Sequence, residues 1–371
     1  MQSSALLAAR IESDRLFEVI SEEALYERPV SERHRLIFYL GHLDAFDWNL
    51  LARRQLSARA FHPAFDALFE RGIDPEPGLL PSDTAADWPG RAEIVAYNWK
   101  TREWIDGHLK EMDPALLQMA IEHRLMHAET LAYLLHNLPY SSKRGAPPQG
   151  DLRRAPDNPL VALGAGIAML GTPDAAFGWD NERLAHEAVV PEFAISKYKI
   201  SNGDYLRFVQ EGGAPSAFWI RDGVAWMWRG MFGLVPLPLA WPVWVTWQQA
   251  DAYARWRGMA LPSEAQWHRA AGVARGIRGW DPVAVDSDTG QGVRQMTGNG
   301  WEWTSDVFAP FAGFKAHPFY SGYSADFFDG KHYVLKGASP CTAEPLTRPG
   351  FRNWFRPEYP YVFAGFRLVS K

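Results

Sequence analysis

Apolar residues in the first 137 positions recur at helical spacing, and no stretch there alternates as a half-buried strand would. The first of these runs contains Leu6, Leu7, Ile11, Leu16, Phe17 and Ile20. The spacing predicts four amphipathic helices, over 3–21, 31–56, 91–111 and 114–137. Between the second and third, the proline- and glycine-bearing segment 74–90 is predicted to be a long loop. This pattern is typical of a four-helix bundle with one long connection.

The pattern changes after the last of these helices. Residues 138–159 are rich in Pro, Gly, Ser and Arg without periodicity, which predicts a linker. Beyond it, glycine and proline interrupt short apolar runs, and most of the 17 tryptophans lie there. Two helices are predicted in this part, at 201–213 and 246–258, where Ser201 and Thr246 can cap the first turn. We therefore expect a helical domain, a linker and a mostly irregular α+β domain, at 1–137, 138–159 and 160–371.

Composition and charge indicate a globular protein and disfavour some kinds of partner. A length of 371 residues suits two domains of ordinary size, and 47% hydrophobic with 22% charged residues is typical of globular proteins. The net charge of −5 is spread along the chain, so no nucleic-acid partner is expected. The N-terminus does not resemble a signal peptide, and no run of about 18 apolar residues could span a membrane. We expect a cytoplasmic protein without a membrane partner; no pattern indicates its oligomeric state.

Histidines offer the best candidates for chemistry. Cys341 is the only cysteine, which excludes an intrachain disulfide and any multi-cysteine zinc or iron–sulfur site. His123 and His127 stand four apart in a predicted helix, so two imidazoles can share one metal from the same helix face. His42 lies in the middle of an apolar helix and is the best third ligand.

Each of these histidines has a competing structural interpretation. An isolated H-x-x-x-H pair, or a lone buried histidine, is more often a hydrogen-bonded structural residue than a ligand. The apolar helix around the pair favours a metal, because buried imidazoles without partners are costly. Three imidazoles on iron would leave positions open for substrate and dioxygen, whereas zinc on the same ligands would predict hydrolysis. The residues alone leave this choice open.

Segments spread over the whole chain resemble one known family. In the helical part they are GHLDAF at 41–46 and HRLMHAE at 123–129. In the rest they are GWDNER at 178–183, YKISNGDYLRFV at 198–209, PVWVTWQQADAYARWRGMALPSEAQWHRAA at 242–271, GNGWEWT at 298–304, VLKGAS at 334–339, RPGFRNW at 348–354 and FAGFRL at 363–368. With them the chain resembles, nearly end to end, the non-haem iron sulfoxide synthases of ergothioneine and ovothiol biosynthesis.

The resemblance implies a multidomain α and α+β fold. A DinB-like four-helix bundle would precede a C-type-lectin-like domain of the formylglycine-generating-enzyme type. It also implies that His42, His123 and His127 bind Fe(II), with O2 as co-substrate. The implied substrates are small molecules, a histidine derivative such as hercynine and a thiol or selenol. In the implied reaction the sulfur of a thiol is joined to the imidazole carbon and oxidised.

Further site residues follow from the same resemblance. Asn353 and Trp354 match positions that line the family's substrate pocket, and the aromatic faces of Trp354 and Phe355 suit a trimethylammonium group. Tyr320 or Tyr323 matches the region that holds the family's tyrosine proton donor. Either tyrosine could equally be a packing residue, so both interpretations stay open.

Three departures from the family pattern bear on the substrate. Members that use γ-glutamylcysteine carry two arginines where this chain has Asp74 and Pro77, which disfavours an anionic dipeptide donor. Met126 stands where the family often has a glutamine, and a thioether cannot donate a hydrogen bond to an imidazole. Phe355 stands where an acidic residue is frequent. The last two departures leave recognition of the substrate imidazole open and favour an apolar or differently charged donor beside Phe355, so the exact substrate pair is not predicted.

Other activities remain as alternatives. Carbon–selenium bond formation, as in selenoneine synthesis, and thiol dioxygenation would use the same iron site. A zinc-dependent hydrolase or thiol transferase would use the same bundle without oxygen. A non-catalytic lectin-like binding module would need no metal. A formylglycine-generating activity is not expected, because its paired-cysteine metal site has no counterpart in a chain with Cys341 alone.

Overall fold

The structure is a computed structural model that describes residues 2–73, 79–272, 276–289 and 291–370. The chain divides into two compact units, Met1–Ala146 and Pro147–Lys371. The domain boundaries predicted at residues 137 and 159 stay predictions.

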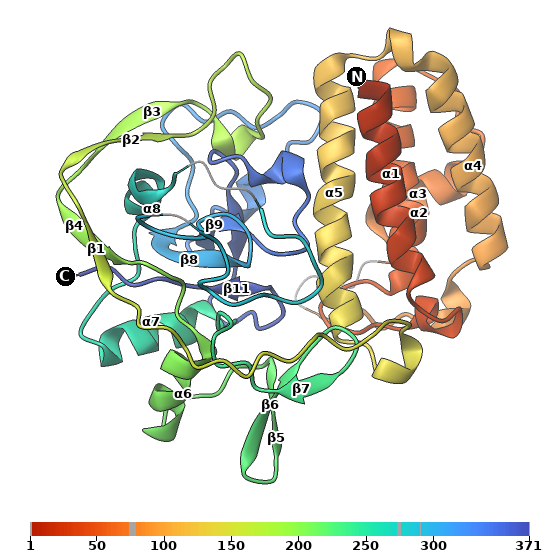
Figure 1. Cartoon of the computed structure of the whole chain (residues 1–371). Helices are drawn as coiled ribbons and strands as arrows, with labels where there is room; N and C mark the ends of the chain where they lie inside the picture. Colours follow the sequence, from red (N-terminus) through yellow and green to blue (C-terminus); the bar gives the residue numbers. More distant parts are fainter. Residues whose placement is uncertain (1, 74–78, 273–275, 290, 371) are drawn as a thin grey trace. The chain divides into compact units, whose positions relative to one another are not determined.

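The first unit is a bundle of helices that lie side by side (Figure 1). Its long helices are α1 (Gln2–Glu18), α2 (Leu36–Asp47), α4 (Arg91–His108) and α5 (Pro114–His136). A π-helix (Trp48–Gln55) continues α2, and the short α3 (Pro63–Arg71) packs against α2. Short 3-10 turns lie at Glu23–Tyr26, Ala85–Asp87, Leu109–Glu111 and Tyr140–Ser142. The periodicity predicts the four long helices but not α3, whose nine residues are too few for a clear apolar pattern.

Local sequence explains the placement of α2 and α5. Helix α5 begins at Pro114 behind Asp113, whose carboxylate accepts hydrogen bonds from the backbone N–H groups of Ala115 at 2.7 Å and Leu116 at 3.1 Å. Helix α2 is buried on nearly every side, which makes it the central helix of the bundle. Helix α5 contacts α2, and Arg124 of α5 donates to Asp44 of α2. The two helices that carry the candidate histidines are therefore direct neighbours.

The second unit consists of small sheets joined by irregular segments. Its strands are β1 (Leu160–Leu163), β2 (Gly166–Leu170), β3 (His186–Val190), β4 (Phe193–Ser196), β5 (Trp219–Asp222), β6 (Ala225–Arg229), β7 (Leu234–Pro236), β8 (Gly300–Val307), β9 (Tyr333–Ala338), β10 (Asn353–Phe355) and β11 (Ala364–Gly365). The largest sheet has the order β10-β9-β8-β11, with β11 parallel to β8 and the other pairs antiparallel. The others are β1-β4, β2-β3 and β5-β6-β7. Further 3-10 turns lie at Asp180–Glu182, Ala325–Phe327 and Glu344–Thr347.

Three helices, α6 (Asn202–Gln210), α7 (Trp247–Trp256) and α8 (Glu264–Ala270), accompany these sheets. The predicted caps of the first two are confirmed, because Ser201 Oγ accepts from Asp204 N–H and Thr246 Oγ1 accepts from Gln249 N–H. Helix α8 is not predicted by periodicity, since it has only seven residues. The capping box at its start, between Ser263 and Gln266, was the sequence signal for it.

Buried indoles and ion clusters hold this unit together where regular structure is sparse. Trp303 in β8 is fully buried, and its Nε1 donates to the carbonyl of Val245 at 2.8 Å. Glu302, next to it in β8, accepts hydrogen bonds from Arg367 and pairs with Lys199. Segments GNGWEWT and FAGFRL thus act mainly in the scaffold.

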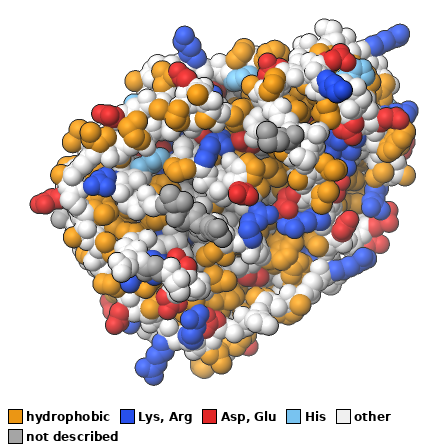
Figure 2. Space-filling model, turned by 45° about the horizontal axis from the view of Figure 1, so that its top comes forward, with side chains coloured by type: hydrophobic (Ala, Val, Ile, Leu, Met, Phe, Trp, Pro, Cys, Tyr) orange, Lys and Arg blue, Asp and Glu red, His pale blue; other side chains and the backbone are white. Residues whose placement is uncertain are grey.

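Charged side chains of both signs are mixed on the face of the molecule drawn in Figure 2. Figure 2 shows Lys and Arg interspersed with Asp, Glu and hydrophobic side chains, without a large field of one sign on the face drawn. Within the described part of the chain, every helix is too short or too polar to cross a lipid bilayer.

Candidate metal centre

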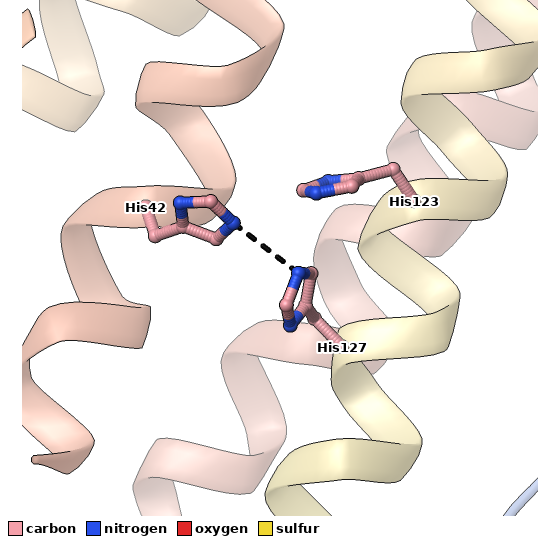
Figure 3. A group of neighbouring side chains, drawn as sticks. All are labelled: His42, His123 and His127. Atoms are coloured by element: carbon pink, nitrogen blue, oxygen red, sulfur yellow. Dashed lines mark hydrogen bonds between the residues drawn. The ribbon is translucent and has the colours of Figure 1, made fainter. Parts of the chain in front are cut away.

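Three histidines from α2 and α5 converge inside the first unit (Figure 3). His42 Nε2 lies 3.2 Å from His127 Nε2, and the ring of His123 lies 5.1 Å from that of His42 and 4.5 Å from that of His127. One nitrogen from each ring falls within 4.8 Å of the others. Among the residues that the structure describes, no other group of three His, Cys, Asp or Glu side chains is close enough to share a metal ion.

The orientation of His42 is fixed by a backbone carbonyl. Its Nδ1 lies 2.6 Å from the carbonyl oxygen of Phe69, at the end of α3. A carbonyl oxygen can only accept, so Nδ1 carries the hydrogen and Nε2 keeps its lone pair. Phe38 stacks on the ring, with 4.6 Å between centroids. The lone pair of Nε2 therefore points toward His127, as a metal ligand requires.

Burial keeps the three imidazoles neutral. His42 and His123 are buried, at 8% and 2% exposure, and Phe46 stacks on His123 with centroids 3.4 Å apart. Burial lowers the pKa of His42 from 6.5 to about 4. Burial, followed by the neighbouring imidazoles, lowers the pKa of His123 and His127 well below 6.5. Neutral imidazole is the form that binds a metal.

The donor set fits a metal ion. Nitrogens placed about 2.1 Å from a common metal are about 3.0–3.4 Å apart in octahedral or tetrahedral geometry. The 3.2 Å between the Nε2 atoms of His42 and His127 falls in this range. The other ring nitrogen of His127, Nδ1, is buried and has no hydrogen-bond partner among the residues that the structure describes. Three imidazoles suit iron and zinc alike, so the geometry leaves the metal open.

An ion cluster connects α2 to α5 beside the histidines. Arg124, which follows His123, donates to Asp44 at 2.9 Å and to Asp47 at 2.7 Å. Arg102 of α4 also donates to Asp44, at 2.9 and 2.8 Å. Burial alone would raise the pKa of Asp44, but Arg124 and Arg102 hold it below its ordinary value. Since Asp44 is two residues from His42, the cluster fixes the register of the two ligand-bearing helices.

This cluster was not predicted from the sequence, although the sequence contained a signal for it. Asp44, Asp47 and Arg124 are charged residues in otherwise apolar segments, and such residues are rarely buried unless they are paired. The carbonyl of Phe69 had no comparable signal, because a backbone group has the same chemistry at every position.

The predicted substrate residues divide between the two units. Met126 lies half-buried in α5, directly before His127. Asn353, Trp354 and Phe355 form β10 in the second unit. Asp74 and Pro77, where the arginine pair of the family is missing, lie outside the described residues.

Both candidate tyrosines belong to an aromatic cluster in the second unit. Tyr323 stacks on Trp179 with 4.1 Å between centroids, and Tyr320 lies 5.7 Å from Tyr323. Trp354 meets Tyr323 edge-on at 5.3 Å. The structure therefore brings the predicted tyrosines together with one of the three predicted pocket residues of β10. Ser324, a residue not singled out from the sequence, donates to the Asp180 carboxylate and anchors the tyrosine segment.

The low histidine pKa values predict how the stability of the metal-free protein depends on pH. An unfolded histidine titrates near 6.5, but folded His42 titrates near 4. Between these values the unfolded chain binds more protons, so the free energy of unfolding falls as pH falls from 6.5 toward 4. The slope is at most about 1.4 kcal/mol per pH unit for each histidine. Urea unfolding at pH 7, 6 and 5 measures it. A His42→Gln variant should show a shallower slope; an unchanged slope would contradict the assignment.

Two family profiles together match nearly the whole chain. The "Sulfatase-modifying factor enzyme 1-like domain" family matches residues 148–289 and 275–371, which is more than half of the chain. The "DinB superfamily" matches residues 5–137. The predicted fold class, a DinB-like bundle followed by a formylglycine-generating-enzyme-type domain, is confirmed by these matches.

Several proteins of similar sequence match most of this chain. "Hercynine oxygenase" of Mycobacterium tuberculosis is 31% identical, with 69% of this chain and 72% of the relative covered. "Hercynine oxygenase" of Mycolicibacterium thermoresistibile is 27% identical over 90% of this chain and 86% of the relative. "Ergothioneine biosynthesis protein 1" of Schizosaccharomyces pombe is 28% identical over 95% of this chain. The chain spans only about half, 54%, of the length of that fungal protein.

Proposed function

The chain belongs to the family of the hercynine oxygenases and ergothioneine biosynthesis proteins, and on this premise we propose that it is an iron(II)- and O2-dependent oxidoreductase. It joins the imidazole carbon of hercynine or histidine to the sulfur of a small thiol such as cysteine, and it oxidises that sulfur to a sulfoxide. Hydrogen leaves the imidazole carbon and the thiol. One oxygen atom of O2 ends in the sulfoxide and the other in water, so four electrons pass from the two substrates to O2.

The observation that carries this proposal is the set of three neutral, convergent imidazoles of His42, His123 and His127. These residues would hold the iron. Ferrous iron, when bound there, supplies the one-electron chemistry that lets O2 react with organic substrates. Burial keeps the imidazoles unprotonated, and the aromatic side chains around them limit access of water.

The second unit is proposed to supply substrate contacts and a proton. Trp354 stacks on Phe308 with centroids 4.3 Å apart and meets Tyr323 edge-on, so it is held rigidly. An aromatic face of this kind attracts a trimethylammonium group. Asn353, beside it in β10, offers an amide for hydrogen bonding. Met126 offers the substrate imidazole only an apolar contact. Phe355, in place of an acidic residue, suits an apolar or differently charged part of the donor.

Product analysis tests the function directly. Protein reconstituted anaerobically with ferrous iron is exposed to air with hercynine or histidine and, in separate reactions, with cysteine, γ-glutamylcysteine or a selenosugar. Mass spectrometry should show a sulfoxide adduct with cysteine that requires both iron and O2. A selenium adduct alone would assign the sister carbon–selenium reaction, and an oxidised thiol without adduct would assign dioxygenation. Absence of any O2-dependent product from iron-loaded protein would contradict the proposed activity.

Separate Tyr320→Phe and Tyr323→Phe variants identify the proton donor. Loss of a positioned general acid typically lowers turnover by about 10²–10⁴-fold. We expect such a loss in one variant and turnover within a few-fold of wild type in the other, which then serves as the matched control. Iron content should be unchanged in both, because neither residue belongs to the histidine site. Wild-type turnover in both variants would contradict the proposal that one of these tyrosines donates a proton.

A further inference from the structure

Helix α3 ends against the helix that carries His42. The last four carbonyls of an α-helix have no partner within the helix. In α3 the carbonyl of Leu68 accepts from Gly72 N–H at 2.7 Å, and the next carbonyl, that of Phe69, accepts from His42 Nδ1–H at 2.6 Å. The imidazole thus satisfies a helix-end carbonyl, and the negative end of the helix dipole faces its N–H group. This polarisation makes Nε2 a better electron donor.

Gly41 permits this close approach. The side chain of Phe69 is fully buried, and a Cβ atom on Gly41 would lie 2.5 Å from two carbons of its ring. Every residue larger than glycine would therefore force Phe69 to move. The residue directly before His42 sets how closely the end of α3 can approach that histidine. Glycine weakens a helix interior, so its presence in the middle of α2 has a structural cost that this contact offsets.

We propose that Gly41 and Phe69 position His42 for metal binding. The space above Gly41 seats the ring of Phe69, and the carbonyl of Phe69 then selects the His42 tautomer that presents the Nε2 lone pair to the site. Both are positioning residues, since they act through His42. The inference rests on the proposed metal centre, because this tautomer matters for function only if Nε2 binds a metal.

The other contacts of His42 cannot replace this hydrogen bond. His127 Nε2, 3.2 Å from His42 Nε2, belongs to an imidazole that can either donate or accept there, so it does not select one tautomer of His42 by itself. Phe38 stacks on the imidazole face with an interplanar angle of 27°, which restrains the plane of the ring. A stacked ring makes no hydrogen bond to the edge of the imidazole, so it does not distinguish Nδ1–H from Nε2–H. Selection of the tautomer depends on the carbonyl of Phe69.

A Gly41→Ala variant tests the inference. Ferrous iron affinity, measured anaerobically by competition with a chromophoric chelator, should fall about 10–100-fold, the usual effect of losing an orienting partner of a ligand. The matched control is Gly107→Ala, because Gly107 is also helical and an added Cβ there meets nothing within 4 Å. It should bind iron as wild type does. A second variant, Gly41→Ala with Phe69→Leu, makes room for the new methyl group while keeping the carbonyl, and should recover most of the affinity.

Nitrogen-15 NMR of histidine-labelled, metal-free protein gives a readout independent of metal and of activity. We expect His42 of the wild type to be the Nδ1–H tautomer, and Gly41→Ala to populate the other form. An Nε2–H tautomer in the wild type, or wild-type iron affinity in Gly41→Ala, would overturn the inference even if the wild type binds iron. Absence of iron binding by the wild type would instead contradict the metal centre itself. If Gly41→Ala fails to fold, the double variant and the wild-type NMR spectrum still decide.

Discussion

Replacing His123 with alanine is expected to abolish stoichiometric iron binding and with it all O2-dependent turnover. His123 is buried between Phe46 and the other two histidines, so water cannot easily take its place in the site. The loss in ferrous iron affinity should exceed the roughly 100-fold that removal of an outer-shell partner costs, because a ligand itself is removed. Iron content after anaerobic reconstitution and desalting measures the effect.

The matched control removes another histidine from the same helix. His136 lies near the end of α5, is buried at 1% exposure and is not part of the convergent group. His136→Ala should lower stability but keep one iron per chain. Equal iron loss in both variants would show that the bundle, rather than a ligand, had been damaged. Full iron content in His123→Ala would refute the assignment of this residue as a ligand.

Arg124→Met is expected to lower the free energy of unfolding by about 3–5 kcal/mol, more than any other substitution considered for this protein. The guanidinium is fully buried, and its removal takes from the buried Asp47 carboxylate the cation that donates a hydrogen bond to it. Asp44 keeps Arg102. Urea unfolding of the metal-free protein measures the change.

A half-exposed arginine of the same bundle provides the control. Arg53 has 43% side-chain exposure and pairs with Asp66 at 3.4 Å, so Arg53→Met should lower the free energy of unfolding by less than about 1 kcal/mol.

The effect of Arg124→Met should depend on pH. Burial already raises the pKa of Asp47, and loss of Arg124 raises it further. Protonation of Asp47 then removes its uncompensated charge. The difference in the free energy of unfolding between wild type and Arg124→Met should therefore shrink as pH falls from 7 toward 5. A loss below 1 kcal/mol at pH 7 would show that the cluster does not hold α2 and α5 together.

The helical unit could be predicted well because its signals are local. Long apolar periods determine the four main helices, and the spacing of His123 and His127 places both on one face of α5. Contacts between side chains of distant segments could not be predicted from such local patterns. The contacts of Arg124 with Asp44 and of His42 with Phe69 join residues 80 and 27 positions apart. They depend on which helix faces meet, and in the second case on a backbone atom of a helix too short to be recognised.

The second unit could not be predicted from local apolar patterns. Its strands have two to eight residues, and periodicity cannot define elements of that length. Its fold was accessible through the resemblance of segments such as GNGWEWT, which place Glu302 and Trp303 in the core. The cluster of Trp179, Tyr323 and Trp354 could not have been assembled from sequence, because these residues lie far apart in the chain and meet only through the arrangement of irregular segments.

The central claim is that the imidazoles of His42, His123 and His127 hold one iron ion. Crystals of anaerobically iron-reconstituted protein, measured on both sides of the iron absorption edge, test it most directly. The account predicts one strong anomalous peak inside the helical bundle, about 2.1 Å from one nitrogen of each ring. A peak at any other set of residues, or iron-loaded crystals with no peak among these three rings, would contradict it.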